Sequence, residues 1–181
     1  MIVIGVLAPG GAGSEAASAA VAAIARRAAA GGGARVEVVG VAAARADGDR
    51  QLLDLAAAGV GHATVTRSGA ATIEPADLEL ALRYLPDIRI IVLVAPEAGL
   101  LRVAVAGSSW SAATLVVLGR LDTDAAAIAE AGGAIVLEPP TRDPDEAFAG
   151  LVAAFARRVD AGEQADAAWR ATLAALSIDP A

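Results

Sequence analysis

Strongly apolar runs alternate with helix-period segments along the whole chain, and this alternation restricts the folds that the chain can adopt. Runs rich in Val and Ile, such as residues 1–7, 34–42 and 87–95, are each followed by a segment whose apolar residues recur every three or four positions. The runs are continuously hydrophobic, which is typical of strands that helices cover on both faces of a parallel sheet. We therefore expect an α/β protein with a three-layer α/β/α sandwich around a mostly parallel sheet.

The pattern predicts six strands and seven helices. The strands are expected at residues 1–7, 34–42, 62–67, 87–95, 113–119 and 133–138. The first five helices are expected at 14–30, 48–59, 74–85, 97–107 and 123–132, and two further helices end the chain. Ser14 is the candidate N-cap of the first helix, Gly31 to Gly33 are its stop, and Pro75 fits the first turn of the third helix. The strand at 62–67 is short, so we expect it near an edge of the sheet.

Length and composition exclude several classes of protein. The chain has 181 residues and no cysteine, so one domain over residues 1–181 is expected, without disulfides or thiolate metal sites. No segment reaches about 18 uninterrupted apolar residues, and residues 1–8 lack the basic region of a signal peptide. We therefore expect no membrane partner, and a cytoplasmic location by default.

The charged residues exclude further functions. The formal net charge is −7, which disfavours nucleic acid as a partner, because nucleic-acid binding needs a basic face. All 14 basic residues are arginine, so neither a Schiff-base lysine nor a phosphate-loop lysine is present. His62 is the single histidine, and no metal site is expected.

Three stretches together resemble the ribokinase-like (PfkB) carbohydrate kinases. Residues 9–43 are similar to the family's Gly-Gly signature, its first long helix and the following strand. Residues 47–67 are similar to the segment in which a glycine-rich turn opens a helix that ends in Ala-Gly-Val. Residues 141–176 resemble the C-terminal signature, in which Gly-Ala-Gly-Asp opens a helix with a second helix behind it. The resemblance implies a ribokinase-like fold.

The resemblance also implies a catalytic site, and this chain departs from it. In the family, the Gly-Ala-Gly turn is an anion hole for the transferred phosphate, and the aspartate after it is the base. Asp143, Pro144 and Asp145 stand at the turn, and Glu146 stands at the base. Proline removes an N–H group that could bind the phosphate. Each contact between a carboxylate and the phosphate at about 4 Å costs on the order of 4 kcal/mol at an effective dielectric of about 20. The chain therefore resembles a pseudokinase with a degenerate anion hole.

A helix cap is the other interpretation of this acidic segment. Asp143 or Asp145 would accept hydrogen bonds from first-turn amides, Pro144 suits the start of a helix, and Glu146 complements the helix dipole.

In the helix that follows, an apolar stripe is expected to pack on the sheet, and Trp169 is expected in the core. The stripe consists of Phe148, Leu151, Val152, Phe155 and Val159.

The glycine-rich segment after the first strand is the candidate ligand site. The resemblance implies that a small polar or sugar-like ligand is held here, with Glu15 near the position of a family asparagine. The candidate ligand-binding residues are Gly10, Gly11, Gly13, Ser14 and Glu15. In the family, the segment between the first strand and the Gly-Gly signature supplies the strands of a lid that covers the sugar. Here only four residues separate Gly5 from Gly10, so no such lid is expected.

A dinucleotide-binding motif is another interpretation of this segment. Its glycine positions match Gly11, Gly13 and Ala16, and Glu37, about 20 residues further on, would be the acid that binds the ribose. This match is incomplete, because the turn starts late after the strand and Glu37 lies inside its own strand.

Three functions stay open from the sequence. The first is a non-catalytic ribokinase-like module without a cofactor, which binds a small ligand or a protein and covers its apolar surface as a homodimer. The second is an active kinase that uses Glu146 and Mg-ATP to phosphorylate an alcohol. The third is a Rossmann-like protein that binds a dinucleotide.

Overall fold

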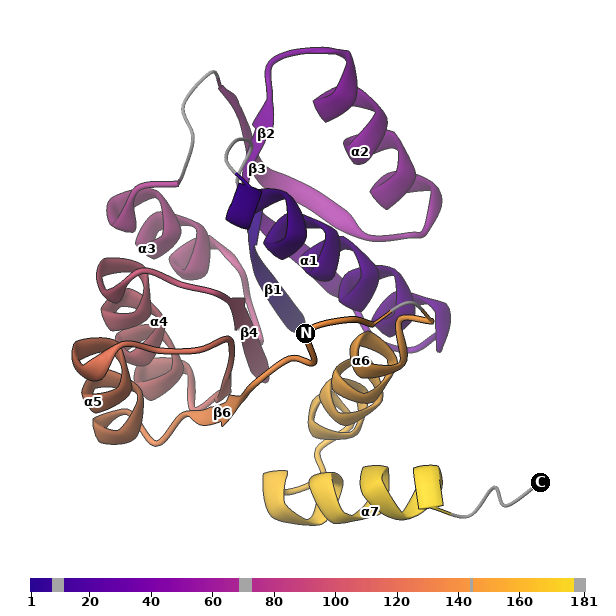
Figure 1. Ribbon diagram of the computed structural model, residues 1–181, viewed down its shortest axis with the longest axis vertical. Coiled ribbons are helices and arrows are strands. Elements are labelled where there is room, and N and C mark those ends of the chain that lie inside the picture. The colour runs from indigo at the N-terminus through magenta and orange to yellow at the C-terminus, as the bar shows by residue number, and fades with distance from the viewer. Residues whose placement is uncertain (8–11, 69–72, 144, 178–181) are drawn as a thin grey trace.

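The structure is a six-stranded sheet with helices on both faces, as the alternating sequence pattern predicts (Figure 1). This computed structural model describes residues 1–7, 12–68, 73–143 and 145–177. The strands are β1 (Ile2–Leu7), β2 (Val36–Ala43), β3 (Gly61–Ser68), β4 (Ile90–Val94), β5 (Thr114–Leu118) and β6 (Ile135–Leu137). The helices are α1 (Ala12–Ala30), α2 (Ala46–Ala57), α3 (Pro75–Tyr84), α4 (Ala98–Ser111), α5 (Thr123–Ala131), α6 (Ala147–Asp160) and α7 (Ala165–Ser177).

All neighbouring strands in the sheet are parallel, in the order β3-β2-β1-β4-β5-β6. The chain starts with β1 at the centre, builds outward to β3, and then returns to add β4, β5 and β6 on the other side of β1. The strand order therefore reverses between β1 and β4. β3 is an edge strand, as predicted for residues 62–67. The prediction that it is short is wrong, because with 8 residues it is as long as β2.

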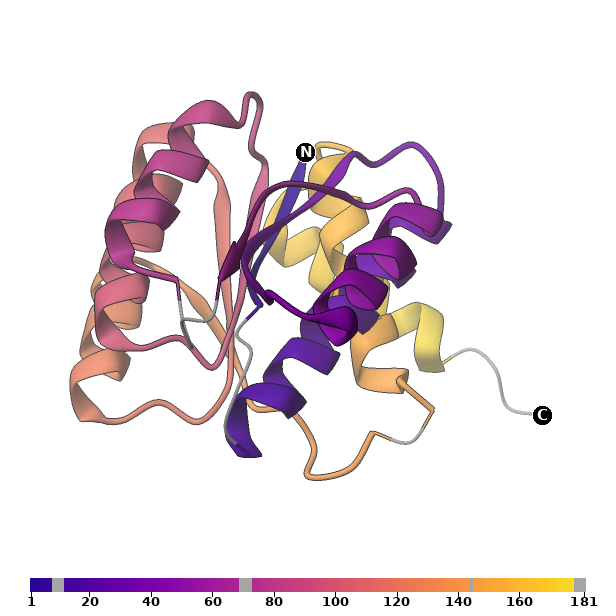
Figure 2. The same cartoon turned by 90° about the horizontal axis from the view of Figure 1, so that it is seen from above.

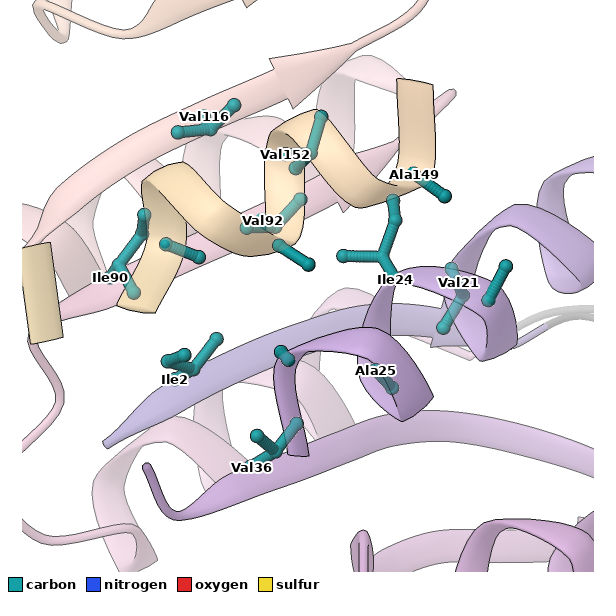
Figure 3. Packing of buried hydrophobic residues seen from close by; sticks show 14 of the residues in the cluster. Ile2, Val21, Ile24, Ala25, Val36, Ile90, Val92, Val116, Ala149 and Val152 are labelled. Atoms are coloured by element: carbon teal, nitrogen blue, oxygen red, sulfur yellow. The ribbon is translucent and has the colours of Figure 1, made fainter. Parts of the chain in front are cut away.

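The helices form two layers (Figure 2). Buried residues of α1, α2, α6 and α7 share one hydrophobic cluster with the sheet, and those of α3, α4 and α5 share the other. Strand β4 shows how both clusters use one run. Ile90 and Val92 face α1 and α6 (Figure 3), whereas Ile91 and Leu93 face the opposite layer. Because both faces are covered, every residue of β4 is buried, and the three-layer sandwich is confirmed.

Helix α1 is built mainly from alanine, and this lets it lie close to the sheet and to α6. Ala25 and Ala28 are fully buried on α1, and Ala156 is fully buried on α6. The helix begins at Ala12, so the prediction of Ser14 as its N-cap is wrong. Alanine has the highest helix propensity of any residue, and the helix begins two residues earlier, at Ala12. It ends at Ala30 before Gly32 and Gly33, which both have positive φ.

The apolar stripe of α6 packs on the core as predicted, except for Leu151, which is half-buried and lies outside the cluster on the sheet. Val152, Phe155 and Val159 are buried against the sheet and α1. The ring of Phe155 meets that of Trp169 from α7 edge to face, with centroids 5.4 Å apart. The tryptophan therefore packs on the core, as predicted.

Among the described helices, none has both the length and the hydrophobicity needed to span a bilayer.

Candidate functional site

A groove of about 790 Å³ opens at the carboxyl edge of the sheet. Its base is formed by Val94 and Leu118, the last residues of β4 and β5, and by Ala95 and Gly119, which follow them. Helix α1, the start of α6 and the segment after β6 enclose it. In open parallel sheets, ligands bind outside the carboxyl ends of the strands, where the strand order reverses. The groove lies beside that point.

The interior of the groove is apolar, and its charged residues lie on the segments that frame it. Three carboxylates, from Glu138, Asp143 and Glu146, and one guanidinium, from Arg120, line its described part. Arg120 follows β5 and Glu138 follows β6, so the pairing of these two strands brings them together. The Nε and Nη2 atoms of Arg120 both donate to Oε1 of Glu138, with the Nε–Oε1 distance at 2.9 Å.

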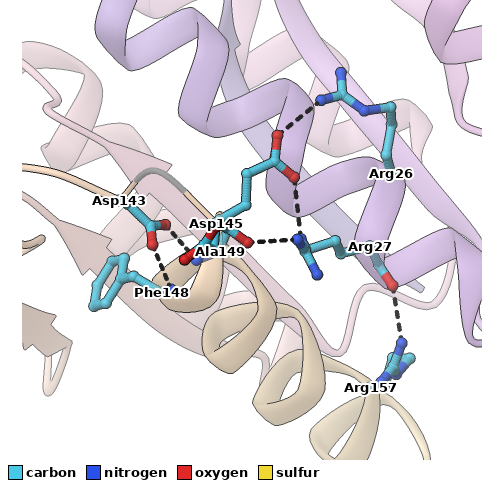
Figure 4. A network of polar contacts seen from close by, with 8 residues as sticks. Arg26, Arg27, Asp143, Asp145, Phe148, Ala149 and Arg157 are labelled. Carbon is cyan, nitrogen blue, oxygen red and sulfur yellow. Dashed lines mark hydrogen bonds and ion pairs between the residues drawn. The ribbon is translucent and has the colours of Figure 1, made fainter.

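Asp143 occupies the N-terminus of α6, where the resemblance places an anion hole (Figure 4). Its Oδ1 accepts a hydrogen bond from the amide of Phe148 at 3.1 Å, and its Oδ2 accepts one from the amide of Ala149 at 3.2 Å. The amide of Gly150 donates to the carbonyl oxygen of Glu146 at 2.9 Å. A helix start attracts anions through unpaired amides. At α6 a side-chain carboxylate already takes that place.

The titration of Asp143 reflects these bonds. Partial burial raises the pKa of its carboxyl group. Hydrogen bonds from the amides of Phe148, Ala149 and Ala147 lower it, as does the positive charge of Arg27. The lowering effects prevail, so the pKa of Asp143 lies below its ordinary value. The helix-cap interpretation of the acidic segment is therefore confirmed for Asp143.

Glu146, the candidate catalytic base, is engaged in ion pairs with α1. Its Oε1 lies 3.5 Å from Nη2 of Arg26, and its Oε2 lies 3.1 Å from Nε of Arg27. Arg27 also donates to the carbonyl oxygen of Asp145 at 2.9 Å. Glu146 has a left-handed backbone with φ of 52°, which is unusual for a residue with a side chain. The arrangement fixes the start of α6 against α1, with both oxygens of the carboxylate occupied.

The Asp143 cap gives a testable prediction about stability and pH. Replacing Asp143 with alanine is expected to lower the melting temperature by about 2–4 °C at neutral pH, as for loss of a helix cap. Because the folded pKa is lowered, the contribution is complete above the unfolded pKa near about 4 and is lost as the pH falls through the folded value. Melting curves of wild type and Asp143→Ala should therefore converge below about pH 4.

Asp145→Ala is the matched control, because the side chain of Asp145 is exposed and only its backbone carbonyl contacts Arg27. It should change the melting temperature little. Equal losses for the two variants, or a gap that widens in acid, would contradict the cap.

The other predicted site residues lie in three places. Gly10, Gly11 and Pro144 fall outside the described residues. Gly13, Ser14 and Glu15 belong to the first turn of α1, next to the groove-lining Ala16. The predicted contact of these residues with a ligand stays a prediction.

Glu37 does not fit the role of a ribose acid. It is the second residue of β2, at the amino edge of the sheet, whereas the groove lies at the carboxyl edge. Its side chain is 8% exposed, and its Oε1 lies 3.2 Å from Nη2 of Arg35. The prediction of Glu37 as the ribose acid is therefore wrong. In a parallel sheet all strands start at one edge and end at the other, so a residue at the start of β2 lies far from the end of β1. His62 lies half-buried in β3, with its Nδ1 atom 3.2 Å from the carbonyl oxygen of Val60.

Sequence reasoning missed Arg120 and Glu138. Glu138 directly follows the end of β6, and Arg120 lies two residues after the end of β5. In a parallel sheet such positions meet at one edge. That placement was the available signal. In the part of the chain that the structure describes, no group of three or more His, Asp or Glu residues could hold a metal ion.

Comparison with known proteins gives the fold and little beyond it. No family model matches the sequence, and no curated protein is similar to it. The crystal structure of Sa239 is similar with a TM-score of 0.61 and 11% identity, over 90% of this chain and 82% of that one. At this identity the similarity shows a common fold.

Fructokinase from Xylella fastidiosa is also among the structural neighbours. One structure has a TM-score of 0.45 and 13% identity, and covers 86% of this chain and 57% of the fructokinase. The structure with bound ATP has a TM-score of 0.45 and 15% identity, and covers 86% and 56%. The chain thus spans less than two thirds of the fructokinase, and a likeness at this level indicates nothing about its own chemistry. Membership of the ribokinase-like family stays a prediction.

Proposed function

We propose that the protein is a non-catalytic α/β domain that binds a small, largely apolar molecule in the groove at the carboxyl edge of its sheet. The observation that carries this proposal is the Asp143 carboxylate on the amides of α6. It leaves a groove beside a helix start that no longer attracts phosphate. On this proposal the resemblance to ribokinase-like kinases concerns the fold, and the protein does not transfer phosphate.

The electrostatics around α6 support the absence of phosphoryl transfer. A transferred phosphate needs donors and positive charge fixed where negative charge develops. The amides of Phe148 and Ala149 bind Asp143, and the guanidinium of Arg27 binds Glu146. A phosphate group would have to displace both carboxylates or lie against them. The alternative of an active kinase with Glu146 as base requires that Glu146 first leave its two arginines.

The apolar lining of the groove supports a ligand site. Small-molecule sites are concave, mostly apolar, and carry a few polar groups that orient the ligand. Ala20 and Ile24 of α1 and Phe148 of α6 line the groove together with the ends of β4 and β5. The backbone at Ala95 has a φ of 45°, a left-handed conformation that residues with side chains adopt mainly where the surroundings enforce it. Such positions gather at ligand sites.

Dinucleotide binding is the second candidate, because one observation favours it. The strand order β3-β2-β1-β4-β5-β6 is the order of dinucleotide-binding folds, in which the cofactor lies across the same carboxyl edge. The position of Glu37 at the opposite edge counts against it.

A melting scan with nucleotides separates these functions. A nucleotide present at 100 times its dissociation constant would stabilise the protein by about 2.7 kcal/mol, which is a shift of several degrees. We expect no shift with Mg-ATP or ADP at millimolar concentration. A saturable shift with Mg-ATP would overturn the proposal in favour of a kinase, and a shift with NAD alone would establish the second candidate.

A further inference from the structure

We propose that the groove takes a small organic amine, with its apolar body against α1 and α6 and its ammonium group at Glu138. This inference rests on the proposed function, since it names the ligand class of the same groove.

The room and the lining of the groove suit an apolar body. Its volume of about 790 Å³ lies within the range of sites for small molecules, roughly 300–1,000 Å³. Ala16, Ala20 and Ile24 supply one wall, and Phe148 supplies part of the other. Phe148 is the one aromatic side chain in the described lining, so a ring on the ligand has a partner on that side.

Among the described residues, one of the three carboxylates that line the groove has an oxygen without a hydrogen-bond donor. Both oxygens of Asp143 accept backbone amides of α6, and both oxygens of Glu146 accept arginines of α1. Glu138 differs, because Arg120 donates twice to its Oε1 while the described residues supply no donor to its Oε2. Glu138 is therefore the acceptor that a bound molecule can reach.

The charge of the groove selects the kind of donor. Arg26 and Arg27 of α1 balance the carboxylate of Glu146. The other two carboxylates of the described lining, from Asp143 and Glu138, are accompanied by one guanidinium, from Arg120, which leaves one net negative charge at the groove. A carboxylate or phosphate on the ligand would meet this negative charge without the amides of α6, which Asp143 already binds. An ammonium group donates up to three hydrogen bonds and complements the charge.

Three probes with one apolar body test the inference. Naphthylethylamine, naphthylethanol and naphthylacetate present the same ring with an ammonium, a hydroxyl and a carboxylate group. Their dissociation constants, from calorimetry, should rank in that order, with the amine bound about tenfold more tightly than the carboxylate. High salt should weaken the amine and leave the alcohol unchanged, because salt screens only the charged pair.

Glu138→Gln removes the proposed acceptor charge and keeps the size of the side chain. The amine should bind about threefold to fivefold more weakly to this variant, and the alcohol should bind as to wild type. Glu130→Gln is the matched control, since Glu130 is an exposed residue of α5 that does not line the groove. It changes the net charge equally and should leave all three constants unchanged.

The outcomes distinguish failure of the inference from failure of the proposed function. If none of the three probes binds saturably, both the groove as a site for this class of ligand and the inference fail. If the probes bind but the carboxylate equals the amine, or if Glu138→Gln behaves as Glu130→Gln, the ligand site stands and the amine preference is wrong.

Discussion

Gly48→Ala is expected to destabilise the protein by about 3 kcal/mol, and to lower its melting temperature by about 6–12 °C. Gly48 lies buried in the first turn of α2, against the end of β2. A Cβ atom at this position would lie 2.0 Å from the carbonyl oxygen of Ala43 and 2.9 Å from its backbone N and C atoms. No side-chain rotation relieves a contact with backbone, so α2 would have to move away from the sheet. Chemical denaturation of both proteins measures the effect.

Gly150→Ala is the matched control for this substitution. Gly150 lies in α6, and an added Cβ would meet only the side chain of Arg27, at 3.6 Å from Nη1 and 3.8 Å from Cδ. These are ordinary contacts, and alanine in a helix is favoured over glycine by roughly 0.5–1 kcal/mol. The control should therefore be neutral or more stable than wild type. A Gly48→Ala protein as stable as Gly150→Ala would show that α2 does not pack on β2 as described.

The fold could be predicted because its signals are local. Continuous apolar runs identify strands buried on both faces, and β4 confirms this with five buried residues in succession. Gly32 and Gly33 end α1 with positive φ, and Pro75 begins α3. The start of α1 was misplaced because alanine before Ser14 extends a helix as well as a polar cap starts one. Such boundaries depend on small differences in free energy.

The candidate site could be predicted only in part, because it depends on distances between segments remote in sequence. The helix-cap interpretation allowed either Asp143 or Asp145 as the cap, and the hydrogen bonds from the amides of Phe148 and Ala149 confirm it for Asp143. The ion pairs of Glu146 with Arg26 and Arg27 join residues about 120 positions apart, which no local pattern indicates. The predicted single domain and the homodimer stay predictions.

These contacts also explain why an acidic segment stands at a position that resembles an anion hole. The start of α6 needs a negative partner for its amides, and in a kinase the substrate phosphate supplies it. Here Asp143 supplies it from within the chain, and Arg26 and Arg27 balance the carboxylate of Glu146. The acidic segment therefore stabilises the start of α6 from within the chain.

Filling the groove is expected to have the largest effect on function. Ala20→Phe adds a bulky ring to the wall of the groove on α1, and should weaken binding of a small apolar molecule at least about tenfold. Ala16→Phe, at an exposed position one turn earlier on the same wall, should act in the same direction if the first variant folds poorly. Ala76→Phe is the control, since Ala76 is exposed on α3 in the opposite layer.

Titration of phenylnaphthylamine, an uncharged dye that fluoresces in apolar sites, tests the central claim most directly. We predict saturable binding to wild type and to Ala76→Phe, and greatly weakened binding to Ala20→Phe and Ala16→Phe, with melting temperatures that show all four proteins folded. Absence of saturable binding to wild type, or equal affinity for wild type and both groove-filling variants, would contradict the claim that the carboxyl edge of the sheet is a ligand site.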